Sequence, residues 1–314
     1  MSLTFPKFIN HMMILGLGIS GCETDESQNT LRESVLTMLN TTHCQVRVCS
    51  DSIATVLTAF PPKEGGTILI AGTGSNCIFL LPIVGQPCVA RVISCGGWGA
   101  DLADYGSGYW IAMEAVKHMI DYEDFFKRSH CSIDCLSLPV AKVKAIVLKK
   151  FGLKSLVDIF DAFGSQKLPK SQIAQIALEI ANLADSDDAL AKHIFHEAGR
   201  HLANMVLGII RSTSKRFGKP FVIQCLAKNE QRMDVACSGS VFKSWHLLRP
   251  GFLSIMNSSN ENSLREQFPE ITCIRLRRLC CSAAVGAAVF ANLPSTKFTV
   301  EWQLNSVVFE NIFP

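Results

Sequence analysis

The first sixty residues alternate between strand-like and helix-like stretches, and this alternation restricts the fold more than any other feature. Residues 12–19 are apolar without interruption, which is typical of a buried strand. A helical pattern begins after Thr24, a second strand pattern covers 45–49, and a short helix is expected at 53–60 before Pro61. This β-α-β-α order predicts an α/β fold with a parallel sheet.

The rest of the chain adds a helix-rich segment to this organisation. The helix after Thr24 is expected to bury one face, made of Leu31, Val35, Met38 and Leu39. Further strands are expected at 89–94 and 235–238, and further helices from Ser107 to Val116 and at 141–150, 153–163, 171–184, 186–212 and 279–292. The last of these is rich in small residues, which indicates a buried helix packed closely on its neighbours.

A tight bend, Gly72-Thr73-Gly74-Ser75-Asn76, joins the apolar runs 67–71 and 77–81. The third glycine of a dinucleotide fingerprint is absent, and so is the Gly-Lys-Ser/Thr of a Walker A loop. Backbone N–H groups and hydroxyls at such a bend suit a phosphate or a sugar hydroxyl. An ordinary hairpin turn built from turn-forming residues explains the same pattern equally well.

Asp51 stands at the carboxyl end of the second expected strand. Ligands of open α/β sheets gather at this end of the strands, where a carboxylate can accept a proton from a hydroxyl nucleophile. The alternative is that Asp51 only caps the following helix.

Two further loops carry residue types that suit small ligands. In the loop from Cys95 to Gly99, with Asp104 to Ser107 after it, glycines allow close backbone approach, Trp98 offers a flat face to a sugar ring and the carboxylate can accept from hydroxyls. The turn Gly239-Ser240 opens a helix and can receive a nucleotide or simply pack tightly.

Composition excludes several classes of protein. The chain has 314 residues, and its formal net charge of +3 is too small to indicate nucleic-acid binding. No apolar run approaches the roughly 20 residues of a membrane span, although residues 7–22 carry a short export-signal-like pattern. The 13 cysteines are irregularly spaced, as in a reduced cytoplasmic protein. His130 to Cys135 lacks a second ligand pair for zinc, and His193, His196 and His201 are expected on a solvated helix face.

Taken in order, these segments resemble the N-acetylglucosamine kinase family, BadF/BadG-type ATPases of the actin/hexokinase-like fold. The resemblance is carried by Ile68–Cys77, Cys95–Trp110, Ser238–Trp245 with Gly251-Phe252, and Ser282–Ala288. It implies two ribonuclease H-like lobes. The small lobe would be residues 1–61, the large lobe 62–290, and 291–314 a tail that returns to the small lobe.

The resemblance also implies a role for each matching residue. Asp51 would be the base that takes the proton of the sugar's 6-hydroxyl. ATP, with Mg²⁺, would be bound by Thr73, Gly74, Ser75, Ala174, Gly239 and Ser240. The sugar, N-acetyl-D-glucosamine, would be bound by Asn76, Cys95, Gly97, Trp98, Gly99, Asp104 and Ser107. No metal ligand among the side chains, no membrane or nucleic-acid partner, and a homodimer are expected.

The sequence departs from the family at two places. Tyr105 replaces an acidic residue of the family's Asp-Glu-Gly-Ser motif, and a phenol cannot accept hydrogen bonds as a carboxylate does. The family's first glycine-rich phosphate hairpin has no counterpart, so the sequence is expected to be an N-terminally truncated form with an incomplete first lobe. The strand at 12–19 should then expose an unpaired apolar edge.

The sequence therefore predicts an ATP-dependent kinase acting on the 6-hydroxyl of N-acetyl-D-glucosamine. The first alternative is a catalytically inactive homologue or splice form that binds sugar or a protein partner. The second is another ATPase of this fold, a dehydratase activator with an iron–sulfur cluster. Cys280-Cys281 and the Cys131/Cys135 pair do not supply a convincing cluster site.

Overall fold

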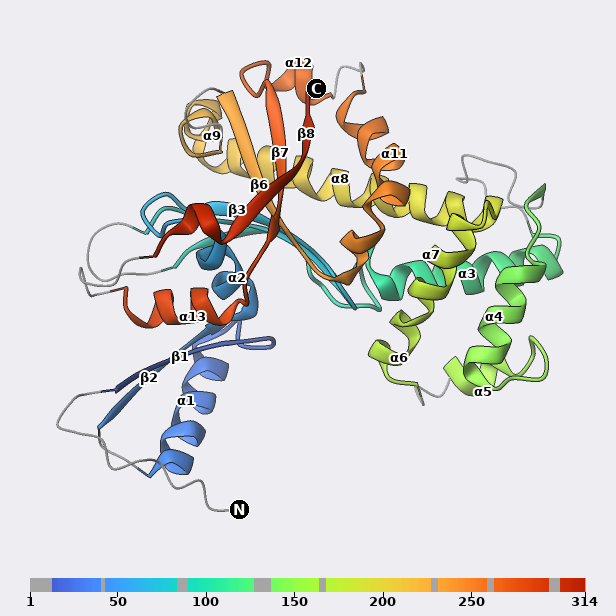
Figure 1. Cartoon of the computed structure of the whole chain (residues 1–314), viewed down its shortest axis with the longest axis horizontal. Helices are drawn as coiled ribbons and strands as arrows, with labels where there is room; N and C mark the ends of the chain where they lie inside the picture. The colour runs from blue at the N-terminus through green and yellow to red at the C-terminus, as the bar shows by residue number, and fades with distance from the viewer. Residues whose placement is uncertain are drawn as a thin grey trace. The chain divides into compact units, whose positions relative to one another are not determined.

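The computed structural model has an α/β fold (Figure 1) and describes residues 13–40, 43–83, 90–126, 137–163, 168–226, 231–258, 263–293 and 300–313. The chain divides into two compact units. The first consists of Met1–Gly66, Leu80–Val92 and Arg278–Val307, and the second of Thr67–Phe79, Ile93–Arg277 and Val308–Pro314. The lobe limits at residues 61 and 290 remain predictions.

The first unit contains the β-α-β-α segment predicted from the sequence. Strand β1 (Met13–Ile19) pairs in parallel with β2 (Cys44–Ser50), in register from Met13 opposite Cys44 to Ile19 opposite Ser50. Helix α1 (Asp25–Leu39) connects the two strands, and α2 (Asp51–Ala59) follows β2 directly. The predicted parallel pairing is confirmed.

The burial expected for β1 and α1 is wrong in part. In the described sheet β1 pairs with β2 on one edge, and its Met13 is 48% exposed instead of buried. On α1 the predicted Met38 is 84% exposed, while Leu31, Val35 and Leu39 pack with Leu36 against the strands. A narrow helix stripe is enough to cover a two-stranded sheet, so Met38 falls outside it.

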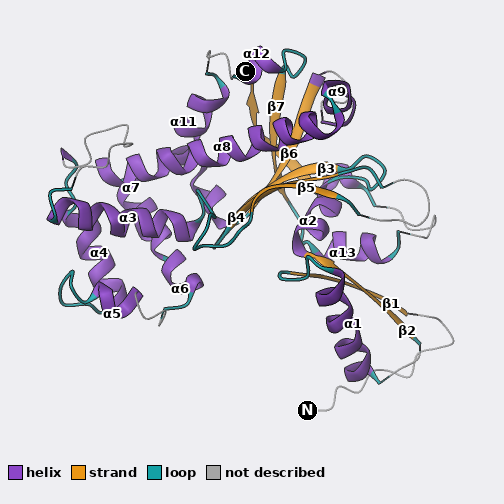
Figure 2. Cartoon of the chain, turned by 180° about the vertical axis from the view of Figure 1, so that it is seen from behind, coloured by secondary structure: helices purple, strands orange, loops and turns teal. Residues whose placement is uncertain are grey.

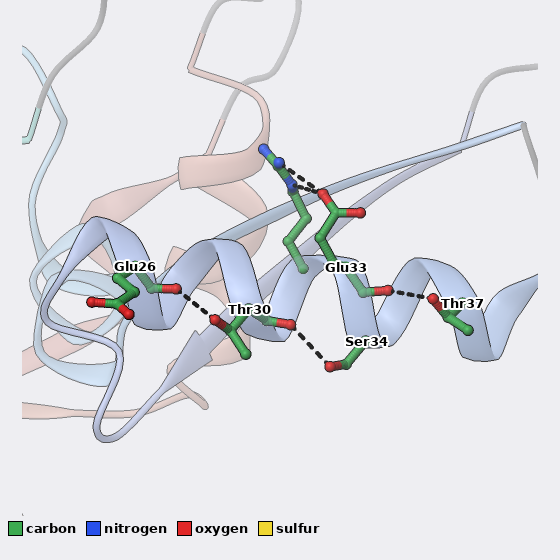
Figure 3. Close-up of polar contacts among 6 residues, drawn as sticks. Glu26, Thr30, Glu33, Ser34 and Thr37 are labelled. Carbon is green, nitrogen blue, oxygen red and sulfur yellow. Dashed lines mark hydrogen bonds and ion pairs between the residues drawn. The ribbon is translucent and has the colours of Figure 1, made fainter.

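Helix α1 satisfies much of its polar surface locally (Figure 3). The hydroxyls of Thr30, Ser34 and Thr37 each donate to the backbone carbonyl four residues earlier, at 2.9 Å. At its start, Thr24 and Ser27 form a reciprocal capping box. The helix is therefore held by its cap and its apolar stripe, with hydroxyl side chains folded back on the outer face.

Helix α13 (Ala284–Ala291) packs closely in the first unit, as its small residues predict. A Cβ on Gly286 would lie 1.7 Å from the Ala54 carbonyl oxygen of α2, and one on Gly16 of β1 would lie 2.1 Å from the Ala287 carbonyl oxygen. The helix is shorter than the predicted 279–292, because Leu279 ends a strand, β7 (Cys273–Leu279). The short helix η3 (Trp302–Leu304) follows, and the Trp302 indole donates to the Leu57 carbonyl at 3.0 Å.

The other sheet has six strands in the order β5-β4-β3-β6-β7-β8. Its strands are β3 (Gly66–Ala71), β4 (Ser75–Leu80), β5 (Val92–Gly96), β6 (Arg232–Ser238), β7 and β8 (Ser306–Ile312). Strands β3 and β6 are parallel, with Thr67 opposite Val235 and Ile70 opposite Ser238. The sequence analysis missed β7 and β8.

The second unit is rich in helices (Figure 2). They are α3 (Gly108–Glu123), α4 (Ala141–Phe151), α5 (Ile159–Phe163), α6 (Lys170–Ala174), α7 (Ile176–Asp185), α8 (Ala189–Phe217), α9 (Lys219–Leu226), η2 (Ser240–Ser244), α11 (Trp245–Met256) and α12 (Leu264–Gln267). Helix α8 packs against α11, α7 and α3. In the part of the chain that the structure describes, no helix has the length and apolarity that a membrane crossing requires.

The helix predicted at 153–163 is wrong in its first half. Gly152 adopts a left-handed conformation that ends α4, and the Asp158 carboxylate accepts from the amides of Lys154 and Ser155, both at 2.8 Å. These bonds favour a turn, so helix resumes only at Ile159.

The histidine prediction for α8 is wrong as well. His193 is buried and His201 half-buried, and burial is the main cause that lowers the pKa of each imidazole. These two positions share the broad apolar face of a helix that packs against α3, α7, α9 and α11, so they are not solvated.

Candidate functional site

The Gly72–Asn76 bend is held by the start of α3. The Gly72 amide donates to the Gly74 carbonyl at 2.9 Å, which closes the turn between β3 and β4. The first two amides of α3 also donate to the turn. The Gly108 amide donates to the Gly72 carbonyl at 2.8 Å, and the Tyr109 amide donates to the Thr73 carbonyl at 3.2 Å. These amides are therefore occupied, and they hold the bend against the start of α3.

Ser75 and Asn76 connect the bend to the glycine loop. The Ser75 hydroxyl donates to the Tyr105 carbonyl at 2.7 Å, and the Gly97 amide donates to the Ser75 carbonyl at 3.1 Å. Gly97 has φ +76°, and a Cβ there would lie 2.7 Å from the Asn76 amide group. The Asn76 Oδ1 is buried without a hydrogen-bond partner, and a buried acceptor of this kind is costly unless a ligand donates to it.

Asp104 binds the loop backbone. Its side chain is 8% exposed, and the carboxylate accepts from the backbone amides of Ser75 and Gly99. Burial raises the pKa of this carboxyl above its usual value, while the two amides and Lys170 act in the opposite direction. Asp104 was predicted as a sugar contact, and its backbone role follows only from the folded structure.

Ser107 and Cys95 also have structural surroundings. Ser107 is fully buried and caps α3, its hydroxyl accepting from the Trp110 amide at 3.1 Å. The Cys95 sulfur lies over α8, so close that a Cβ on Gly208 would be 2.4 Å from it. Trp98, in contrast, is 74% exposed, beside Gly99 with φ +90°.

Three predicted nucleotide residues from distant parts of the chain line one pocket of about 430 Å³. They are Thr73 of the bend, Ala174 at the end of α6 and Ser240 at the start of η2. The turn before Ser240 lies against the bend, because a Cβ on Gly239 would be 2.2 Å from the Ala71 carbonyl oxygen. The parallel pairing of β3 and β6 brings these two turns to the same edge of the sheet. Gly74, Ser75 and Gly239 are not among the described lining residues of this pocket.

The walls of this pocket combine apolar and charged groups. Ile111, Ala177, Leu178 and Phe195 supply apolar surface, and Leu178 is 66% exposed. Lys150 and Lys243 are exposed cations on its rim, and Glu179 is the carboxylate among the described lining residues. A pocket of this size and composition suits a planar base with an attached anionic group.

Asp51 belongs to the first unit, as the first residue of α2 directly after β2. The cap of α2 is Ser50, whose hydroxyl accepts from the Ile53 amide at 3.3 Å. The alternative in which Asp51 merely caps the helix is therefore wrong. Its carboxylate accepts from the Ser52 hydroxyl at 3.3 Å and keeps further acceptor capacity.

The sequence analysis missed an aromatic cluster beside the loop. The Tyr105 ring stacks on His201 at 5.0 Å between ring centroids, and Trp110 meets the same imidazole edge-on at 4.8 Å. These three residues line a second pocket of about 470 Å³. In the sequence, the cluster is indicated only by Tyr105, which replaces an acidic residue of the family motif. Its partner His201 on α8 can be identified only from the fold.

Among the described residues, no group of three or more histidine, cysteine or acidic side chains is arranged to hold a metal. Cys280 and Cys281 are free thiols. The pattern from His130 to Cys135 lies outside the described residues.

Comparison with known proteins gives relatives in sequence but no matching family model. The chain is 24% identical over 229 residues to an N-acetylmuramic acid/N-acetylglucosamine kinase of Clostridium acetobutylicum, covering 73% of this chain and 61% of the relative. It is 25% identical over 276 residues to an N-acetyl-D-glucosamine kinase of Dictyostelium discoideum, covering 88% of this chain and 74% of the relative. The chain thus spans about three-fifths of the length of the first relative.

Two solved structures share the fold. A candidate N-acetylglucosamine kinase from Chromobacterium violaceum matches 88% of this chain and 75% of its own, with a TM-score of 0.52 and 18% identity. A second, from Porphyromonas gingivalis, matches 89% and 76%, with a TM-score of 0.53 and 16% identity. The predicted fold class is confirmed: the chain has the α/β fold of sugar kinases with the actin/hexokinase-like ATPase architecture, and in sequence it resembles kinases named for N-acetylglucosamine.

Proposed function

We propose that the chain is an ATP-dependent kinase that phosphorylates the 6-hydroxyl of N-acetyl-D-glucosamine. The observation that carries this proposal is the single pocket lined by Thr73, Ala174 and Ser240, three residues chosen from the sequence as nucleotide contacts and separated by at least 66 positions along the chain. The names of the two sequence relatives support the sugar.

In this proposal the pocket binds ATP with its base against the apolar wall at Ala174 and Leu178. The Thr73 bend receives the phosphates and Ser240 receives the adenosine, with Gly239 shaping the turn directly before Ser240. Mg²⁺ fits this arrangement, since a pocket with Glu179 as its described carboxylate suits an ion bound mainly by phosphate oxygens and water. When bound, the ion neutralises phosphate charge.

The sugar is proposed to lie at Asn76, Gly97, Trp98 and Gly99. The unpartnered Asn76 Oδ1 accepts a sugar hydroxyl or amide proton, and Trp98 covers a ring face. Cys95, Asp104 and Ser107 contribute by holding the loop, because their polar groups face the protein. This assignment narrows the sequence prediction, in which all seven residues contact the sugar.

Asp51 is the proposed base. Its carboxylate takes the proton as the 6-oxygen bonds to the γ-phosphorus and the bond from that phosphorus to ADP breaks. The carboxylate is suited to this role because the helix cap is supplied by Ser50 instead. A cytoplasmic homodimer is part of the same proposal.

The proposal is tested by sugar-dependent ADP release, measured with N-acetylglucosamine, N-acetylmannosamine, N-acetylmuramic acid and glucose. We expect turnover with N-acetylglucosamine and a kcat loss of about 10²- to 10⁴-fold in Asp51→Asn. Asp25→Asn is the matched control, since Asp25 is also the first residue of a helix in the same unit, and its turnover should be unchanged. A folded chain that binds ATP but releases no ADP with any of these sugars would contradict the proposal.

A further inference from the structure

Strands β4 and β5 place two cysteines directly opposite each other. The Gly97 amide donates to the Ser75 carbonyl at 3.1 Å at one end of the pair, and the Leu81 amide donates to the Arg91 carbonyl at 2.8 Å at the other. Counting two residues forward from Ser75 and two back from Gly97 reaches Cys77 and Cys95. Counting four residues back from Leu81 and four forward from Arg91 reaches the same two cysteines. Because the two counts agree, no bulge shifts the register between these hydrogen bonds.

Directly opposed residues of an antiparallel pair point to the same face of the sheet, with Cα atoms about 4.5–5.5 Å apart. This range lies within the roughly 4.4–6.8 Å that a disulfide requires. Burial is the main cause that raises the pKa of Cys77, and the neighbouring Cys95 raises it further, which is consistent with their closeness. Register and spacing therefore permit a disulfide without movement of the strands.

The two thiols differ in access. Cys77 is fully buried, whereas Cys95 is half-buried and immediately precedes the Gly96-Gly97 turn. Burial raises the pKa of both thiols, so only a small fraction of each is thiolate near neutral pH, and that fraction grows as the pH rises. Because Cys95 is the less buried of the two residues, the first reaction with a small oxidant is assigned to it.

We propose that Cys77 and Cys95 form a reversible cross-strand disulfide when the folded protein meets a peroxide. The Cys95 thiolate attacks one peroxide oxygen, the O–O bond breaks, and Cys95 becomes a sulfenic acid while the peroxide leaves as water or an alcohol. The Cys77 thiolate then attacks the Cys95 sulfur and displaces hydroxide, which takes a proton and leaves as water. The two thiols lose two electrons in all, and the peroxide is the group reduced.

This bond would join the strands one residue from Asn76 and two from Gly97, at the base of the loop proposed to bind sugar. The disulfide itself depends only on the register. Its effect on sugar binding rests on the proposed function and is measured separately.

The test is hydrogen peroxide treatment of the folded full chain, followed by non-reducing peptide mapping. We expect one cross-linked pair containing Cys77 and Cys95, removed by dithiothreitol. Cys77→Ser and Cys95→Ser should each abolish it. Cys237→Ser is the control, because Cys237 also lies near Cys77 but β3 separates its strand β6 from β4. The cross-link should survive in that variant.

If a variant fails to fold, the peptide map of the oxidised wild-type chain is sufficient to test the proposal. A Cys77–Cys237 bond, or Cys95 found only as sulfenic or sulfinic acid, or both thiols still free at a peroxide dose that oxidises Cys280, would overturn it. If the disulfide forms while the chain shows no sugar-dependent turnover, the proposed function fails and this inference stands.

Discussion

Asp104 shows how one buried carboxylate can organise a loop. It adopts a left-handed backbone conformation with φ +60°, and its oxygens accept from the Ser75 amide at the bend and the Gly99 amide in the glycine loop. A Cβ on Gly74 would lie 2.8 Å from Asp104 Oδ2, so the bend and the carboxylate are in direct contact. The carboxylate thereby couples the proposed phosphate bend to the proposed sugar loop.

Asp104→Asn should destabilise the protein by about 1–3 kcal/mol, because an amide offers one acceptor oxygen and places a donor against a backbone amide. Chemical denaturation measures the change. Asp101→Asn is the matched control, since Asp101 lies in the same loop with a side chain 77% exposed. Equal stability of Asp104→Asn and Asp101→Asn would contradict the loop-holding role.

His201 makes stability depend on pH. Burial lowers the pKa of its imidazole, so the unfolded chain binds more protons than the folded one below the unfolded value of about 6.5. Stability is therefore lost as the pH falls below that value and through the lower folded pKa. His201→Gln should show a smaller fall in Tm from about pH 7 to pH 5 than the wild type.

The remaining fall in that variant is assigned to His193, whose pKa burial also lowers. His196→Gln on the same helix serves as the control, since this side chain is 38% exposed. Parallel Tm-against-pH curves for wild type and His201→Gln would show that the Tyr105–His201 stack does not keep the imidazole neutral.

At the scale of elements, the parallel neighbours β3 and β6 bring two turns together at one edge of the sheet. Gly239 makes this approach possible, with φ +109° and no space for a Cβ beside the Ala71 carbonyl. Gly239→Ala should therefore lower the free energy of unfolding by more than Gly152→Ala does. Gly152 also has positive φ, at +66°, but nothing lies within 4 Å of its would-be Cβ.

We expect Gly152→Ala to lower the free energy of unfolding by about 1–2 kcal/mol, because alanine is strained at positive φ. Gly239→Ala should lose more in urea unfolding and also weaken ATP binding, because its turn forms part of the pocket. Similar losses in the two variants would argue against close packing of the two turns.

The sequence allowed the β-α-β-α segment, α3 and α8 to be predicted because their apolar periodicity and caps are local signals. Strand β7 was missed since Arg275, Arg277 and Arg278 hide its alternation, and Asp234 on β6 pairs with the first two only in the folded sheet. The backbone role of Asp104 and the burial of His201 also depend on distant partners. Thr73, Ala174 and Ser240 were identified by family resemblance, and only the fold brings them to one pocket.

At the scale of the whole molecule, the proposed nucleotide contacts belong to the second unit and the proposed base, Asp51, belongs to the first. ATP binding and phosphoryl transfer can consequently be measured apart. In the proposed function, ATP binding depends on the pocket of the second unit, and phosphoryl transfer also requires Asp51. A measurement of ATP binding tests the pocket lined by Thr73, Ala174 and Ser240, on which the proposed function rests.

The most direct test is calorimetric titration of the folded chain with ATP and Mg²⁺, comparing wild type with Ala174→Trp, which fills the pocket. Ala145→Trp, at an exposed position on α4, is the control. We predict saturable binding to the wild type and to Ala145→Trp, and a Kd at least about tenfold weaker in Ala174→Trp, equivalent to roughly 1.4 kcal/mol. No binding to the folded wild type, or equal affinity in Ala174→Trp, would contradict the assignment of this pocket to the nucleotide.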